Sequence, residues 1–304
     1  MLRKDFIKLA AMAGVIISPA GKIRNEQKAG ELTAAELQKY LVSLTVLPER
    51  TVDRIVIGDP QTRIKKIGTC WMPVWSTLKE AVKAGVNVMV THEPTFYTHW
   101  DLDEKKEGYH SSIESTKQAY LELVEKKKKW INENGLVIIR NHDTLDALKE
   151  VGIPYSLGTF LGYKNSDIIN SKTFYNVYRI DKQPAGVVAK NIARKLAEFG
   201  QPGVAFYGDP DYQVTSVGVG TGAICDPMRF SDLKPDLAIA IDDSVKTWTQ
   251  TTFATDSGKP LVVINHGTSE EAGLQMLNKI IRERFTGIDV RHFKQGCTYK
   301  WITA

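Results

Sequence analysis

The sequence predicts an α/β fold in which mostly parallel sheets are flanked by helices. Short apolar runs alternate with amphipathic helical patterns along almost the whole 304-residue chain, and this alternation is typical of strand–helix–strand units. The composition, 42% hydrophobic and 25% charged, is that of a globular protein with cores of substantial size. The number of predicted strands favours two sheets over one.

The first half of the chain contains two predicted α/β units. Thr33 and Glu36 have the spacing of a capping box, which predicts that a helix starts there. A strand at 65–73, a helix at 77–85 and a strand at 87–90 follow, and the two strands of such a unit should be parallel. The other elements predicted in this half are a strand within 53–60, a long helix ending at Gly135, a strand at 136–140 and a helix at 144–152.

The second half continues the alternation and ends with a strand that includes His292, which we expect at the edge of a sheet. The predicted strands are 174–180, 204–208, 214–220, 236–241, 261–265 and 289–293, and the predicted helices are 186–200 and Ser269 to about Phe285. Gly218, Gly220 and Gly222 lack the rest of a dinucleotide-binding fingerprint, so they indicate a tight turn.

Residues 1–22 resemble a twin-arginine export signal. A basic stretch at 3–8 (RKDFIK) precedes an apolar run and small residues ending at Ala20, which is the order of regions in a signal peptide. Lys4 stands where the motif has its second arginine. We therefore expect an exported, periplasmic protein that starts near Gly21. The alternative is a cytoplasmic protein whose first residues form an ordinary helix.

Charge and cysteine content exclude several classes of protein. The formal charge is +5, and its one dense run, Lys126–Lys129, lies on a predicted helix without interleaved aromatic or arginine residues. That pattern favours a solvated helix face, so we expect no nucleic-acid partner. Cys70, Cys225 and Cys297 are widely spaced and odd in number, which argues against a disulfide framework. No apolar run is long enough for stable membrane insertion.

Three predicted strands end in the same way, with a polar residue and then a histidine. These histidines are His92, His142 and His266, and the carboxylates close to them are Glu93, Asp143, Asp146 and Glu270. Ligands of parallel α/β sheets bind beyond the carboxyl ends of the strands, so side chains at these positions can converge on one pocket. A single strand-end histidine is more often structural, but three repeats of the arrangement favour a metal site.

The residue types indicate which metals the site prefers. Imidazole and carboxylate ligands together suit zinc, manganese, iron or nickel rather than calcium. Five or more such ligands exceed one tetrahedral zinc site, so two divalent ions fit the number better. His99 is close enough in sequence to serve as an acid or base, or as an outer-shell group. Asp242 and Asp243 either face the same crevice or cap the following segment.

These motifs resemble the Nif-three-like family of dinuclear-metal proteins, some of which are labelled GTP cyclohydrolase type 2. The family's Thr-His-His-Pro appears as Thr91–Pro94 (THEP), its His-Thr-Asn-x-Asp as His142–Asp146 (HDTLD), and its C-terminal Gly-His-x-x-x-Glu as Asn265–Glu270 (NHGTSE). The resemblance extends from about Thr33 to Trp301. It implies five metal ligands: His92, Glu93, Asp146, His266 and Glu270.

The resemblance also implies an architecture. It predicts two similar α/β domains, the first formed by 33–130 with 255–304 and the second by 131–254, so that the C-terminal segment returns to the first domain. It further implies a homohexamer whose metal sites face an internal cavity. Glu93 departs from the family's histidine and makes the ligand set more anionic. Ile241–Asp243 (IDD) replaces the family's Thr-Gly-Glu, which affects the expected substrate pocket.

The function that we expect from the sequence is metal-dependent hydrolysis. Two ions would activate a small substrate, such as a phosphoester or nucleotide-like molecule, and a carboxylate or His99 would move the proton. An exported protein would not meet cytosolic GTP, which argues against GTP ring opening. The alternative is a non-catalytic hexamer that binds metal or serves as a scaffold.

Overall fold

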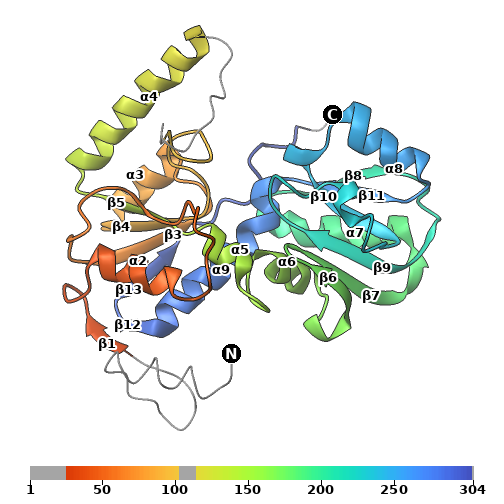
Figure 1. The fold of residues 1–304 in the computed structure, drawn as a ribbon, viewed down its shortest axis with the longest axis horizontal. Helices are drawn as coiled ribbons and strands as arrows, with labels where there is room; N and C mark the ends of the chain where they lie inside the picture. Colours follow the sequence, from red (N-terminus) through yellow and green to blue (C-terminus); the bar gives the residue numbers. More distant parts are fainter. Residues whose placement is uncertain (1–24, 103–113, 303–304) are drawn as a thin grey trace.

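The computed structural model describes residues 25–102 and 114–302, and it confirms an α/β fold with two main sheets flanked by helices (Figure 1). The export signal expected at 1–22 lies outside these residues. A small parallel pair, β1 (Asn25–Lys28) with β12 (Phe285–Gly287), lies apart from the two main sheets. Within the described ranges, no helix is both long and apolar enough to cross a membrane.

The first sheet is parallel except at one edge. Its strands, in sheet order, are β13 (Asp289–His292), β3 (Lys66–Cys70), β4 (Val88–Thr91), β5 (Val137–Arg140) and β2 (Ile55–Ile57). The predicted parallel pairing of β3 with β4 is confirmed, and β2 is the antiparallel strand. His292 lies on edge strand β13, as predicted.

Helices cover both faces of the first sheet. Helices α2 (Ala34–Val42) and α9 (His266–Arg284) pack with one set of strand side chains, and α3 (Trp75–Lys83) and α4 (Glu114–Glu133) with the other. The two sets arise because successive strand residues point to opposite faces. The predicted capping box is present: the Glu36 amide donates to Thr33 Oγ1 (3.2 Å), and the Thr33 amide donates to the Glu36 carboxylate (2.8 Å).

The second sheet is parallel only at its centre. Its strands, in sheet order, are β6 (Ile168–Lys172), β7 (Tyr175–Pro184), β9 (Gln213–Gly220), β10 (Leu237–Ile241), β11 (Leu261–Ile264) and β8 (Ala205–Tyr207). Strands β9, β10 and β11 are parallel, whereas β6, β7 and β8 join through antiparallel pairs. The prediction of mostly parallel strands therefore holds for the first sheet and only for the centre of the second.

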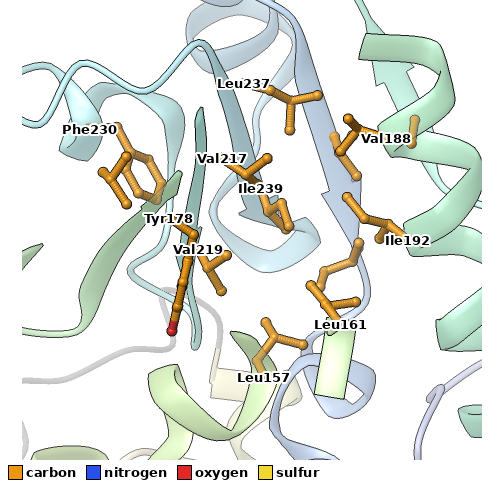
Figure 2. Packing of buried hydrophobic residues seen from close by; sticks show 14 of the residues in the cluster. Leu157, Leu161, Tyr178, Val188, Ile192, Val217, Val219, Phe230, Leu237 and Ile239 are labelled. Carbon is orange, nitrogen blue, oxygen red and sulfur yellow. The ribbon is translucent and has the colours of Figure 1, made fainter. Parts of the chain in front are cut away.

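One face of the second sheet is thickly covered and the other thinly. Helices α6 (Ile153–Leu161) and α7 (Ala185–Leu196) contribute Leu157, Val188 and Ile192 to a large core (Figure 2). The opposite face has a small cluster to which α8 (Thr252–Asp256) contributes only Ala254. Short segments complete the fold: η1 (Asn165–Asp167), η2 (Ala197–Phe199), η3 (Pro227–Phe230), η4 (Asp242–Ser244) and the π-helical η5 (Thr247–Thr251).

The two sheets are related by an internal repeat. Across each sheet, three neighbouring parallel strands are followed by an antiparallel edge strand. The order β3-β4-β5-β2 in the first sheet therefore corresponds to β9-β10-β11-β8 in the second. Both edge strands are followed by the same tripeptide, Gly-Asp-Pro, at 58–60 and at 208–210. Gly58 and Gly208 adopt nearly equal φ angles of +101° and +102°, in the left-handed region that favours glycine.

The membership of the sheets differs from the domain boundaries expected at residues 130 and 255. Strand β5, expected in the second domain, pairs with β4 in the first sheet, and β11, expected in the first, pairs with β10 in the second. The reason lies in the pairing of the repeated units, in which β5 is the third strand of the first unit and β11 the third strand of the second. The chain returns to the first sheet only after β11, through α9, as the predicted C-terminal return requires.

Two local predictions were wrong. The helix expected at 144–152 ends early: α5 is Asp143–Ala147, Leu148 is extended, and α6 then starts after Gly152 with a proline in its first turn. The glycines expected in a tight turn lie mostly within a strand. Gly218 and Gly220 belong to β9, where a Cβ atom would meet Phe230 or Cys225 at 2.6–2.8 Å.

Candidate metal centre

The three strand-end histidines converge between the two sheets. His92 follows β4, His142 follows β5, and His266 follows β11 after the helix cap Asn265. The carboxyl ends of parallel strands share one edge of a sheet, which explains the meeting of His92 and His142. Their rings stack with centroids 4.4 Å apart. His266 comes from the other sheet, so the centre lies at the junction of both.

Glu270 lies between two of the histidines. One turn after His266 on α9, its Oε1 is 3.1 Å from His266 Nε2, and its Oε2 is 3.3 Å from His92 Nε2. Asp146 Oδ1 lies 3.6 Å from His92 Nε2, and Glu93 Oε1 lies 3.4 Å from His266 Nε2. All five residues that the resemblance implied as ligands therefore lie in one cluster.

The cluster has the spacing and the unpaired atoms that metal ions need. Two ligands of one tetrahedral ion, each at ~2.1 Å, lie roughly 3.4 Å apart, and the four contacts above span 3.1–3.6 Å. His92 Nε2, His266 Nε2 and Asp146 Oδ1 are buried without a well-aligned hydrogen bond to another described residue. Buried polar atoms in proteins rarely lack a hydrogen-bond partner. The donor set thus fits a divalent metal ion.

The electric field of the cluster favours a cation. Burial alone would lower the pKa of His92, but Glu270 and Asp146 outweigh burial and raise that pKa to about 9. Burial likewise opposes the charge on His266, and Glu270 with Asp243 raises its pKa to about 11. The surrounding carboxylates thus stabilise positive charge at the place where the imidazole nitrogens point.

Carboxylates outside the cluster orient the histidines. Asp243 Oδ2 is 2.8 Å from His266 Nδ1 and holds a ring proton on that atom, so that the neutral ring would present the lone pair of Nε2 toward Glu270. The amide of His266 donates to Asp242 Oδ1 (3.0 Å). Asp242 and Asp243 were expected either to face the crevice or to cap the following segment. Their contacts with His266 match the first alternative, and both residues also lie at the start of η4.

Asp53 fixes the conformation of the loop after β5. This nearly buried carboxylate accepts the backbone N–H groups of His142 (2.7 Å), Asp143 (2.9 Å) and Thr144 (2.8 Å). These are donors at a helix start, which a carboxylate satisfies well. Asp53 thereby fixes the short helix α5, from which Asp146 reaches His92.

Arg140 offsets the additional negative charge of Glu93. Its guanidinium is fully buried and lies 3.7 Å from Glu93 Oε2 and 3.4 Å from Asp101 Oδ2. It also donates to the backbone oxygens of His92 (2.9 Å) and His99. The arginine therefore neutralises the outer oxygen of Glu93 and holds the loop after β4, while the inner oxygen faces His266.

His99 lies beside the cluster and not within it. Its ring meets the His142 ring edge to face, with centroids 5.6 Å apart, and it is exposed at the protein surface. Burial of part of the ring, together with the nearby positive charges of Arg140 and His142, lowers the pKa of His99. His142 itself forms a candidate ligand group with His92 and Asp146.

Sequence reasoning missed several supporting residues. The Trp71 indole donates to Glu270 Oε2 (2.7 Å), and Arg140 and Asp53 act as described above. A buried arginine at the end of an apolar strand was a usable signal, because an arginine is almost never fully buried without partners. Trp71 and Asp53 had no such signal, since only the folded chain brings them to the site.

We expect Asp243→Ala to weaken metal binding by about 10–100-fold, the usual effect of removing an outer-shell partner of a histidine ligand. Without the carboxylate, His266 can rotate and its Nε2 atom is no longer aimed at Glu270. Calorimetric titration with zinc or manganese would measure the change. Asp181→Ala, which removes an exposed carboxylate elsewhere, is the control, and equal affinity in both variants would contradict the role given to Asp243.

Comparison with known proteins identifies the family but no specific activity. No curated protein has a matching sequence. Among solved structures, a Staphylococcus aureus hypothetical protein, SA1388, is similar with a TM-score of 0.69, at 18% identity over 91% of this chain and 100% of that one. A Bacillus cereus protein related to NIF3 has a TM-score of 0.66, at 13% identity over 91% and 100%.

Reduced HcgD from Methanocaldococcus jannaschii is a further similar structure, with a TM-score of 0.61 at 17% identity over 86% of this chain and 97% of that one. At these identities the likeness concerns the fold. The sequence evidence is the model of the Duf34/NIF3 (NGG1p interacting factor 3) family, which matches residues 54–296. That range includes β2 to β13 and all five residues of the cluster, and the chain belongs to the DUF34/NIF3 family.

Proposed function

We propose that the cluster holds two divalent ions that share Glu270. The observation that carries this proposal is the position of the Glu270 carboxylate, whose two oxygens face different histidines, at 3.3 Å and 3.1 Å. One ion would be held by His92, Asp146 and Glu270, and the other by His266, Glu93 and Glu270. Zinc, manganese, iron and nickel all suit this mixture of imidazole and carboxylate.

We further propose that the protein is a metal-dependent hydrolase of a small substrate such as a phosphoester. Two ions of this kind polarise the substrate and lower the pKa of a water molecule. The residues of the chain position the ions and exclude water from His92 and Glu270, which are almost wholly buried. His99 stands exposed at the edge of the cluster, where it can exchange a proton with a bound substrate.

The test of this function is a screen of phosphoesters and nucleotides with protein loaded with each metal. We expect His99→Ala to lower kcat by about 10²–10⁴-fold, the usual contribution of a general acid or base, while the metal content stays the same. Tyr97→Ala, an exposed aromatic in the same loop, is the control. Hydrolysis that survives both His99→Ala and removal of the metal would contradict the proposal.

A metal-binding scaffold is the second candidate. Its support is the deep burial of Glu270, 1% exposed, and His92, 0% exposed, because ions with such ligands can serve to hold the two sheets together. In this case the loaded protein would hydrolyse none of the substrates, and its assembly, which we propose to be a hexamer from the sequence resemblance, would depend on metal. Sedimentation with and without a chelator distinguishes the two candidates.

A further inference from the structure

The thinly covered face of the second sheet contains an apolar hollow that the metal centre does not use. It lies between α8 and η3 and has a volume of about 290 Å³. Its apolar wall is formed by Pro227, Phe230, Pro235, Ala238, Phe253 and Leu261. This volume corresponds to about ten water molecules at ~30 Å³ each, so the hollow fits a ligand of similar size.

The hollow exists because α8 is poorly packed on the sheet. The helix has five residues and buries only Ala254, whose methyl group leaves space against β10 and β11. The Phe253 ring lines this space and is still 41% exposed. Protein interiors are otherwise close-packed, so an apolar body in this space would gain contacts that the protein itself leaves unmade.

Two lysines lie at the rim of the hollow. Lys259 Nζ contacts the Tyr212 hydroxyl at 3.1 Å and lies 3.6 Å from Asp236 Oδ1, so its charge is already partly engaged. The ammonium group of Lys234 makes no ion pair or hydrogen bond with another residue in the described part of the chain. Lys234 also has a φ angle of +50°, a left-handed conformation that is costly for lysine.

The acidic groups near the rim already have partners within the protein. Asp236 is occupied by the Thr215 amide and hydroxyl, both at 2.8 Å, and Asp232 pairs with Lys172 at 2.9 Å. An anionic head beside Lys234 would therefore meet an ammonium group that forms no ion pair with these carboxylates, because Asp232, which feels its charge, pairs with Lys172. The apolar wall and the cationic rim together define an amphiphile with one negative charge.

We propose that this hollow binds a small amphiphilic carboxylate, such as a medium-chain fatty acid or an aromatic acid, with its apolar body under α8 and its head at Lys234. The site is independent of the metal centre. Leu261 starts β11, and Asn265 follows its last residue. The two sites therefore lie at opposite ends of this strand, roughly 13 Å apart along it.

The test uses octanoate as the probe and calorimetric titration of the whole protein as the measurement. We expect one octanoate per chain, and binding at least tenfold weaker for octan-1-ol, which has the same apolar chain without the charge. Equal affinity for both, or no binding of octanoate, would overturn the proposal. Absence of binding is also the outcome if a second copy of the chain fills the hollow.

Two variants locate the binding. Lys234→Gly removes the ammonium group and suits the left-handed backbone, and Ser257→Phe obstructs the rim with a bulky side chain. Each should weaken octanoate binding at least tenfold, whereas Lys164→Ala, which removes an exposed lysine elsewhere, should not. Unchanged binding in both rim variants would place octanoate outside the hollow. Binding that disappears with a chelator would place it on the metal, and either result overturns the proposal.

Discussion

Glu270→Gln should remove both metal ions from the protein. The substitution keeps the shape of the side chain but replaces the one carboxylate whose two oxygens face both His92 and His266. A neutral amide cannot supply an anionic oxygen to each ion. We expect the affinity for both ions to fall by more than about 100-fold, beyond the effect typical of outer-shell partners. Metal content per chain, measured by mass spectrometry without a chelator or polyhistidine tag, gives the answer.

Glu93→Ala provides the comparison, because the closest histidine contact of Glu93 is to His266 alone, at 3.4 Å, although it also groups with His92 and Glu270. This variant should retain one ion where Glu270→Gln retains none. Glu133→Gln, an exposed carboxylate near the end of α4, is the control and should keep the content of the unmodified protein. Loss of one ion from Glu270→Gln, with the other bound as before, would exclude a shared carboxylate.

Removing the metal should lower the thermal stability of the protein by on the order of 10 °C. An ion at 1,000 times its Kd stabilises the folded state by about 4 kcal/mol, and for a chain of this size each kcal/mol corresponds to roughly 2–4 °C. The ligands come from both sheets, so the unfolded chain has no comparable site. Calorimetric scans of the loaded and chelated protein would measure the shift.

The same scans on His266→Ala protein supply the control. This variant lacks a ligand, so a chelator should change its melting temperature much less than that of the unmodified protein. Re-addition of the metal should restore the loaded protein and leave the variant almost unaffected. An equal effect of the chelator on both would mean that metal bound elsewhere stabilises the fold.

The sequence contained enough information for the fold class and for the centre of the site. An apolar run followed at once by a polar residue and a histidine is a local signal, and it located His92, His142 and His266 correctly at strand ends. The motif of Glu270, four residues after His266, was equally local. The predicted ends of the helices were less accurate than the predicted strand ends. The helix expected at 144–152, for example, stops at Ala147 because Leu148 adopts an extended conformation.

Features that depend on contacts distant in the sequence could not be predicted. The Asp53 carboxylate lies 89 positions from His142, and the Trp71 indole 199 positions from Glu270. The assignment of β5 and β11 to their sheets is also a matter of pairing partners and not of propensity. Periodicity identifies a strand but carries no information about which neighbour it joins.

The passage from β11 to α9 places the candidate metal centre where the chain crosses from one sheet to the other. The chain leaves the second sheet at Ile264 and enters a helix packed on the first sheet at His266, after the single residue Asn265. A rotation of one sheet against the other would change the distance from His266 to His92, between which Glu270 lies. Ions bound here would therefore act as a lock on the angle between the two halves, and opening the molecule and releasing metal would be one event.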